Sequence, residues 1–286
     1  MAVRHAGIWQ PPPGSRVDTQ HALGQGCMGA WYASATGHGG YWEDISGQNN
    51  HGTLTGMDPA TDWVEGKDGW GLDFDGINDY VVCPTANITP THDLSVVLLA
   101  KWAAWYPASA ANSRFVFSNI NGNDVLQLMG GSNTQKTPRK FSFAINLGGT
   151  QYGYYTTGAG AKADDFALST WYAVVASWNC TSHAIHIYVD GADLALTAGT
   201  GYGLGTADGK LYIAQRSDLG APSAMTASSV TLYQRELSLS DVQRLQAEPH
   251  AHIWVPGRRS TWWFSAAAAA SSIPAIQRYY RNRRQS

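Results

Sequence analysis

The sequence predicts an all-β fold: a two-sheet antiparallel jelly-roll sandwich with one short C-terminal helix and irregular arms at both ends. Three observations predict it. Glycine occurs 31 times and aromatic residues make up 12% of the 286 residues, whereas charged residues make up 14%, a composition that favours strands and turns. Short apolar runs rich in β-forming residues recur, separated by Gly, Asn and Asp. These runs do not alternate with helical patterns, as they would in a parallel α/β sheet.

The first 29 residues are expected to form an N-terminal arm. Three prolines followed by glycine at 11–14 are incompatible with a helix or a central strand. From Ala30 the pattern changes to closely spaced strands. We therefore place one jelly-roll domain at 30–249.

Within this domain, strands are expected in chain order. Alternating residues at 72–75, turn residues at 75–79 and a resumed strand at 80–82 predict a hairpin. Residues 94–102 form a nearly continuous apolar run, typical of a central strand. Further strands are expected at 114–118, 124–129, 140–145, 171–178, 184–189, 210–214 and 229–233.

One helix is predicted after the last strand. Ser238 with Asp241 three residues later is the pattern of a helix cap, and Pro249 ends the helix. Three apolar residues fall along one face: Leu239, Val242 and Leu245.

Residues 250–286 are expected to form a basic, aromatic C-terminal arm. Six of the 19 basic residues follow Glu248, and none of the 21 acidic residues does, so the body carries a net charge of −8 and the tail +6. Such an arm suggests a polyanion, a membrane surface or an acidic protein as partner; a solubilising tail is the alternative. The expected partner-docking residues are Trp254, Arg258, Arg259, Trp262, Trp263, Phe264, Tyr279, Tyr280, Arg281, Arg283 and Arg284.

Redox and targeting signals are weak. The three cysteines lack the paired spacing of a disulfide framework or a zinc site. The N-terminus lacks the apolar core of a signal peptide. The Ala-rich run 264–276 is short and contains Pro274, so no membrane span is expected. We expect a soluble protein made in a reducing cytosol.

Four ordered blocks resemble concanavalin A-like, laminin G-type jelly rolls. WEDISGQNNHGTL at 42–54 is similar to that family's D-x-S-G-x-x-N-H-G-T-L opening, and GLDFDGINDYVV at 71–82 to its L-x-F-D-G-x-x-D-Y-V hairpin. The back-sheet strands are matched at 171–178 and 187–191, and the closing strand and helix at 230–242. The resemblance implies the fold over about 30–248. It does not imply one function, because one fold hosts many.

A narrower resemblance concerns residues 21–31, HALGQGCMGAW. They look like the H-P-L-A-x-G-L-x-G-x-W entry of laminin G-type proteins encoded by tailed bacteriophages, with Ala22 where proline is usual. This resemblance implies a non-enzymatic virion structural protein, such as a capsid decoration or cement protein or a head or tail accessory protein. It would assemble in the host cytoplasm, locate to the virion and dock through its arms on the major capsid protein or neighbouring subunits, as a homo-oligomer or bound to the lattice.

Two alternatives remain. One is a lectin-like attachment module that reads a surface glycan. The other is a glycoside hydrolase, which would need two carboxylates facing each other. The E-x-D-x-x-E run of laminarinase-like relatives is absent, so no enzymatic activity is expected.

Candidate binding residues come from the resemblance to concanavalin A-like jelly rolls. Pentraxin relatives hold calcium through side chains at two strand ends; the corresponding residues here are Asn123, Asp124 and Asp218. Their oxygens suit calcium. Alternatively, Asn123 and Asp124 form a turn and Asp218 is solvated, because the pair is reversed and Arg216 adds positive charge. No other cofactor is expected.

Aromatic and basic residues offer further candidates. Trp105 and Tyr106, beside a proline, could stack on a sugar, whereas Trp102 is expected in the core. His51 is expected to be structural. The Arg-rich tail belongs to no defined nucleic-acid fold, so sequence-specific nucleic-acid recognition is not expected.

Overall fold

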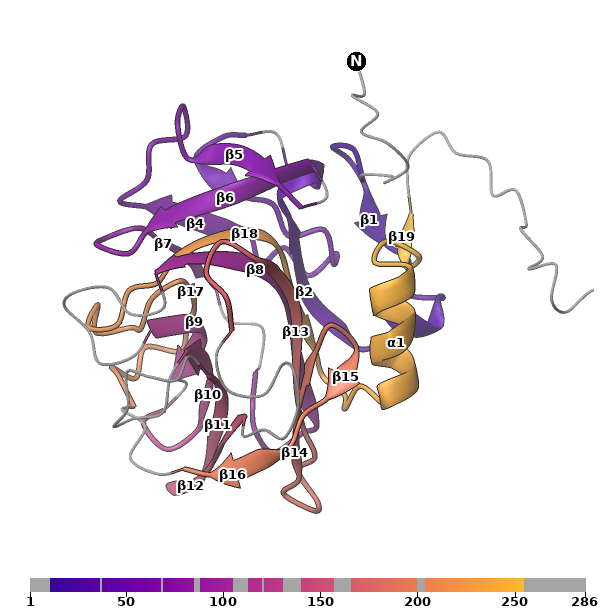
Figure 1. Cartoon of the computed structure of the whole chain (residues 1–286), viewed down its shortest axis with the longest axis vertical. Helices are drawn as coiled ribbons and strands as arrows, with labels where there is room; N and C mark the ends of the chain where they lie inside the picture. The colour runs from indigo at the N-terminus through magenta and orange to yellow at the C-terminus, as the bar shows by residue number, and fades with distance from the viewer. Residues whose placement is uncertain are drawn as a thin grey trace, which may run out of the picture. The chain divides into compact units, whose positions relative to one another are not determined.

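The chain divides into two compact units, Met1–Val255 and Pro256–Ser286. The structure is a computed structural model, and every residue that it describes belongs to the first unit (Figure 1). The described residues are 11–36, 38–67, 69–84, 88–104, 113–119, 121–130, 140–156, 166–199 and 204–254.

A nine-stranded antiparallel sheet forms one layer of this unit. In spatial order its strands are β16 (Leu196–Ala198), β12 (Thr150–Thr156), β11 (Phe141–Leu147), β10 (Val125–Gly130), β9 (Ser113–Asn119), β17 (Leu211–Ile213), β7 (Tyr80–Cys83), β4 (Gly52–Thr55) and β3 (Tyr41–Trp42).

An eight-stranded antiparallel sheet forms the second layer. Its main path is β15 (Ala192–Asp193), β14 (Ile185–Val189), β13 (Trp171–Trp178), β8 (Leu94–Ala104), β18 (Ala224–Tyr233), β6 (Gly69–Asp75) and β5 (Trp63–Gly66), with β2 (Cys27–Tyr32) paired to β18. β1 (Arg16–Val17) and β19 (Ile253–Trp254) form a separate two-stranded sheet. The predicted antiparallel sandwich is confirmed.

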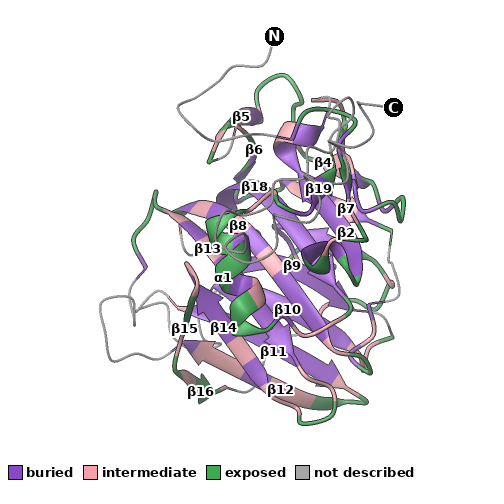
Figure 2. Ribbon diagram, turned by 90° about the vertical axis from the view of Figure 1, so that its right-hand side faces the viewer, coloured by how far each residue is buried: buried purple, intermediate pink, exposed green. Residues whose placement is uncertain are grey.

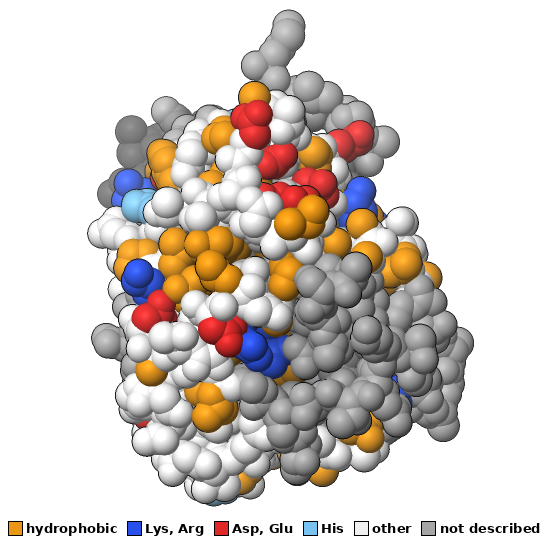
Figure 3. Space-filling view, turned by 90° about the vertical axis from the view of Figure 1, so that its left-hand side faces the viewer, with side chains coloured by type: hydrophobic (Ala, Val, Ile, Leu, Met, Phe, Trp, Pro, Cys, Tyr) orange, Lys and Arg blue, Asp and Glu red, His pale blue; other side chains and the backbone are white. Residues whose placement is uncertain are grey.

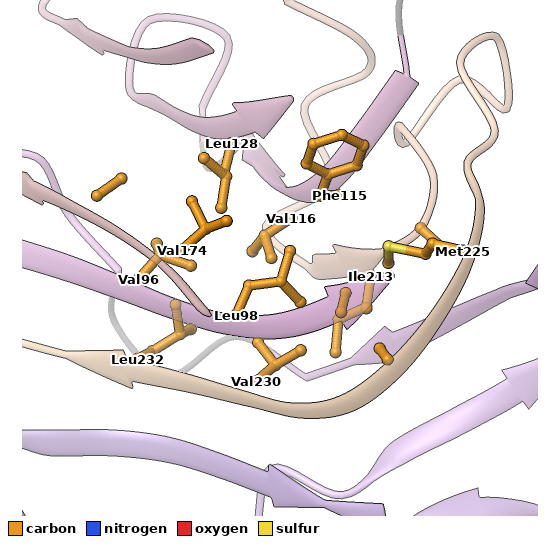
Figure 4. Close-up of a cluster of buried hydrophobic side chains, with 14 of the residues drawn as sticks. Val96, Leu98, Phe115, Val116, Leu128, Val174, Ile213, Met225, Val230 and Leu232 are labelled. Atoms are coloured by element: carbon orange, nitrogen blue, oxygen red, sulfur yellow. The ribbon is translucent and has the colours of Figure 1, made fainter. Parts of the chain in front are cut away.

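The main core lies between the two layers. Leu98 of β8 and Val230 of β18 point toward Val116 of β9 and Leu128 of β10, and all four are fully buried (Figure 4). β8 lies between β13 and β18, so the apolar run 94–102 is central, as predicted. Trp102 at its end is also fully buried, as expected.

The segment 72–82 differs from the predicted hairpin. β6 pairs with β5 and β18, whereas β7 pairs with β4 and β17, so the turn between them crosses from one sheet to the other. The turn is held by Asp79, whose Oδ2 accepts the Asp75 N–H (3.0 Å). Gly76 has φ 77° and lies against Ala224, a conformation that favours glycine. The pattern of turn residues is the same for a hairpin and for a corner between sheets, so sequence alone did not separate them.

The predicted helix is present as α1 (Leu239–Ala247), with a complete capping box between Ser238 and Asp241. Val242 and Leu245 are buried, whereas Leu239 is 43% exposed. No helix among the described residues is long and apolar enough to span a membrane.

A second core cluster lies on the outer side of the eight-stranded sheet. There Val175 and Tyr188 pack with Val242 and Leu245 of α1 and with Ile253 of β19. The burial view shows α1 lying over β13 and β14 (Figure 2). This side of the sandwich is therefore closed by the chain itself.

The packed unit begins before the expected domain boundary at residue 30. Val17, Leu23 and Cys27 are buried in the second cluster, so the described residues 11–29 are part of the unit and not an arm. Likewise, Ile253 is buried and pairs with Val17. The physical reason is that the outer side of the eight-stranded sheet is apolar and the terminal segments cover it.

Candidate functional site

The outer face of the nine-stranded sheet, meaning the side chains that point away from the core, is the candidate site. The opposite outer face is covered by α1, β1 and β19, as described above. Strand register defines a line of directly opposed outer residues from β7 to β11: Val82, Tyr212, Phe117, Gln127 and Ala144. Figure 3 shows the molecule in a space-filling view from the side of β4, β7 and β17, where hydrophobic side chains are grouped beside charged ones.

Two tyrosines stand at the β7–β17 end of this face. The rings of Tyr80 and Tyr212 lie 5.9 Å apart between centroids, tilted by 35°. Tyr212 donates its hydroxyl hydrogen to Asp208 Oδ2 (2.5 Å). Burial, with Asp208 accepting that hydrogen, holds the pKa of Tyr212 well above its usual value. The Tyr212 hydroxyl therefore stays protonated at neutral pH. Half-buried Tyr80 offers ring surface to a ligand.

The centre of the outer face is polar and buried. The Arg114 and Gln127 side chains are fully buried, and Arg114 Nε donates to Gln127 Oε1 (2.9 Å). Asn119 is held on both atoms of its amide: Nδ2 donates to the Leu204 carbonyl (2.6 Å), and Oδ1 accepts the Gly122 N–H (2.8 Å). These hydrogen bonds fix the buried polar groups and the strands that carry them.

The β11–β12 end continues the same chemistry. Asn146 Oδ1 accepts a hydrogen bond from Gln151 Nε2 (3.3 Å). Lys140 Nζ lies 5.0 Å from the ring centroid of half-buried Tyr155, a cation–π distance. Between these pairs the outer residues are the small Ala144 and Gly153, which face each other.

The charge of this sheet is unusual. None of its nine strands contains an Asp or Glu, and Arg114 is the one Lys or Arg within those strand bounds. The face is thus built from amides, hydroxyls, aromatic rings, aliphatic side chains such as Val82 and one guanidinium. Half-buried Tyr80, Gln151 and Tyr155 offer two rings and an amide to a hydroxyl-rich ligand. The amides of Asn119, Gln127 and Asn146 are buried and hold the face in place.

The predicted calcium ligands do not come together. Asn123 and Asp124 follow the end of β9, whereas Asp218 follows the end of the antiparallel β17, at the other end of the strand pair. Asp124 accepts hydrogen bonds from Asn121 Nδ2 (2.7 Å) and Gly148 N–H (3.0 Å). Asp124 therefore stabilises turns, in agreement with the alternative interpretation that Asn123 and Asp124 form a turn.

Asp218 is paired with a cation. Its Oδ1 accepts a hydrogen bond from Arg216 Nε (2.6 Å). Burial acts to raise the pKa of Asp218, but the Arg216 guanidinium outweighs it, and the pKa lies below its usual value. Among the described residues, no group of three or more His, Cys, Asp and Glu side chains could hold a metal ion.

The other predicted residues fall mostly outside the described part of the chain. The glycan candidates Trp105 and Tyr106 lie outside it, as do all the proposed docking residues after Trp254. Trp254 itself is 51% exposed and pairs with Arg16 across β19 and β1. Sequence reasoning missed the outer face; the alternation of Tyr80 and Val82 with core residues on β7 was the available signal.

The 42–54 motif has a structural role. The buried Asp44 carboxylate accepts four hydrogen bonds: from Ala30 N–H (2.9 Å), Ser46 N–H (2.9 Å), Ser46 Oγ (2.8 Å) and Asn50 N–H (2.9 Å). His51 Nδ1 accepts the Asp44 N–H (3.1 Å). His51 therefore has the structural role expected of it, because its ring nitrogen satisfies a backbone N–H group. These bonds tie the loop to β2 and supply no chemistry.

Comparison with known proteins agrees with this fold. Residues 75–243, more than half of the chain, match the family model described as the concanavalin A-like lectin/glucanases superfamily. A comparison with curated proteins finds no match.

Several solved structures share the fold. The binding domain of Paraclostridial Mosquitocidal Protein 1 has a TM-score of 0.57 and 13% identity, over 78% of this chain and 52% of that chain. The receptor binding domain of botulinum neurotoxin C/D mosaic serotype has a TM-score of 0.55 and 11% identity, over 78% of this chain and 51% of that chain. The binding domain of botulinum neurotoxin DC in complex with rat synaptotagmin II has a TM-score of 0.52 and 11% identity, over 79% of this chain and 52% of that chain. The chain spans about half the length of each. At these identities the similarity shows the fold alone.

Proposed function

This chain belongs to the concanavalin A-like lectin/glucanases superfamily, and on that premise we propose that it is a non-enzymatic, lectin-like module that binds a glycan on the outer face of its nine-stranded sheet. The observation that carries the proposal is the composition of that face. Half-buried Tyr80, Tyr155 and Gln151 are its accessible aromatic and amide groups. Tyr212 packs beside Tyr80, and buried amides at Asn119, Gln127 and Asn146 fix the strands between the two ends of the face. Aromatic rings and planar hydrogen-bonding groups match the apolar and hydroxyl-bearing faces of a sugar.

Binding without hydrolysis is favoured by the same composition. A glycosidase on this face would place two carboxylates about 5–10 Å apart across the sugar. The strands of the sheet carry none. Glu236 accepts a hydrogen bond from Asn179 (2.7 Å) and follows β18 in the other sheet.

A glycan array with the intact chain tests the proposal. We expect binding to a restricted set of glycans, unchanged when calcium is replaced by EGTA, because the predicted calcium ligands are engaged in separate loops. Binding that disappears in EGTA would overturn the metal-independent site. Silence in both conditions would remove the glycan proposal.

We propose a second role, as a virion structural protein, because of where the chain leaves the packed unit. The last described residue, Trp254, is exposed, and the residues that follow hold six arginines and no acidic residue. Aromatic and arginine side chains are the usual anchors of protein interfaces. The neighbouring subunits of a capsid, with acidic patches, would be the partners, and the glycan-binding face would be displayed outward.

Deleting residues 255–286 tests this second role. Because β19 ends at Trp254, the truncated chain is expected to keep its thermal stability and its glycan binding. It is also expected to be lost from purified particles of the virus that encodes it, measured by quantitative mass spectrometry. Incorporation equal to that of the intact chain would contradict docking through the tail.

A further inference from the structure

Two histidines lie in the turn that leads from α1 into β19. His252 is fully buried, and His250 is half-buried. Both rings stand edge-on to the ring of Tyr32 on β2, at centroid distances of 6.3 Å for His252 and 5.7 Å for His250. His252 Nε2 lies 3.3 Å from the Tyr32 hydroxyl oxygen. Both imidazole rings of the turn therefore contact β2.

The same turn holds the two terminal strands together. The backbone oxygen of His252 accepts the Asp18 N–H (2.7 Å) at the end of β1, and Ile253 next to it pairs with Val17. Val17 and Ile253 are both 8% exposed and belong to the second core cluster. The buried His252 ring and the backbone pairing of β19 with β1 therefore belong to the same short segment.

The groups around His252 do not favour a positive charge. Tyr32 of β2 is a neutral hydrogen-bonding partner, and Thr231 of β18 donates to it (3.5 Å). Among the described residues, the charges that act on the His252 ring are those of His250 in the turn and His21 before the 3₁₀ segment Ala22–Gly24. The carboxylate of Asp18, in the facing segment, accepts the Gln20 N–H (3.0 Å). Protonation would place like charges together in a buried site, which is costly.

We propose that His252, with His250 beside it, is an acid-sensitive latch: it holds β19 against β1 at neutral pH and releases the chain from residue 250 onward in acid. This proposal is independent of the glycan and virion roles, because it concerns the outer side of the eight-stranded sheet.

The pH range follows from the linkage between protonation and opening. The pKa of both rings is lowered from 6.5 to about 4, by burial for His250 and, for His252, by burial together with the charges of His250 and His21. An opened turn would restore the ordinary value. The closed form is therefore fully favoured above pH 6.5 and loses its advantage as the pH falls from 6.5 to 4. Between pH 7 and pH 5 the equilibrium constant for opening the turn should rise by about tenfold or more.

Hydroxyl-radical footprinting of the intact chain tests the latch. Labelling of Ile253 and Val17 is expected to increase as the pH falls from 6.5 to 4, while labelling of β8 stays low. In the variant His250→Phe/His252→Phe, which keeps ring volume without the titrating group, labelling should not change over this range. The control His92→Gln removes an exposed histidine and should behave like the original chain.

Constant labelling of Ile253 in the original chain would overturn the latch. An equal increase in the double variant would also overturn it, because the acid response would then come from other groups. If the double variant does not fold, an NMR titration of the histidine ring protons in the original chain decides: a pKa below 5 for His252 supports the latch, and an ordinary value contradicts it.

Discussion

Replacing Asp44 with Ala should destabilise the protein by about 3 kcal/mol or more, since hydrogen bonds to a charged acceptor contribute about 1.5–3 kcal/mol each and do not add fully. The substitution removes the acceptor of four hydrogen bonds and leaves the backbone N–H groups of Ala30, Ser46 and Asn50 without it. All three residues are buried. Unfolding in urea, followed by tryptophan fluorescence, gives the free energy of unfolding.

Two variants calibrate this measurement. Asp44→Asn keeps one acceptor oxygen and should lose less stability than Asp44→Ala. Asp58→Ala removes an exposed carboxylate that accepts the Ala60 N–H (2.9 Å) and should change the free energy of unfolding by under about 1 kcal/mol. Equal effects of Asp44→Ala and Asp58→Ala would show that the loop bonds do not organise β2.

The second large effect is expected on ligand binding. Replacing Tyr80 with Ala should weaken binding of the glycan selected on an array by about 30-fold, which corresponds to the ~2 kcal/mol typical of an aromatic anchor. The reason is that half-buried Tyr80 is the outer-face ring of β7 beside Tyr212. Isothermal titration calorimetry measures the change.

Matched variants separate this effect from general loss of structure. Tyr80→Phe keeps the ring and should retain most of the affinity. Trp70→Ala removes a larger ring, 42% exposed, from β6 of the other sheet and should leave binding unchanged. Loss of binding in Trp70→Ala but not in Tyr80→Ala would place the ligand elsewhere.

The fold could be predicted from the sequence because its signals are local. β8 has a continuous apolar run, and α1 has a cap and a proline stop. The pairing of β6 and β7 could not be predicted in the same way, because the residues that form their turn are compatible with a hairpin and with a corner. The pairing of each strand depends on which strands from elsewhere in the chain bind to its two edges, and the turn residues do not determine those partners.

The candidate site was hidden for a related reason. Gln127 and Asn146 come from the consecutive strands β10 and β11, whereas Tyr212 comes from β17, much later in the chain. Strand register brings all three onto one face. The predicted metal ligands were inferred from positions near strand ends, but the direction of β17 relative to β9 separates them. Residues 11–29 were wrongly predicted to form an arm, because a proline-rich start is typical of one. In the structure, Val17 and Leu23 pack against the apolar outer side of the eight-stranded sheet.

Hydrogen–deuterium exchange of the intact chain, with and without the glycan selected on the array, tests the central claim most directly. Bound glycan should slow exchange in β7, β9, β10 and β17, whose outer residues form the site, and leave β13, β14 and α1 unchanged. Protection confined to those last three elements, or no change on the nine-stranded sheet at saturating glycan, would contradict the assignment of the ligand to this face.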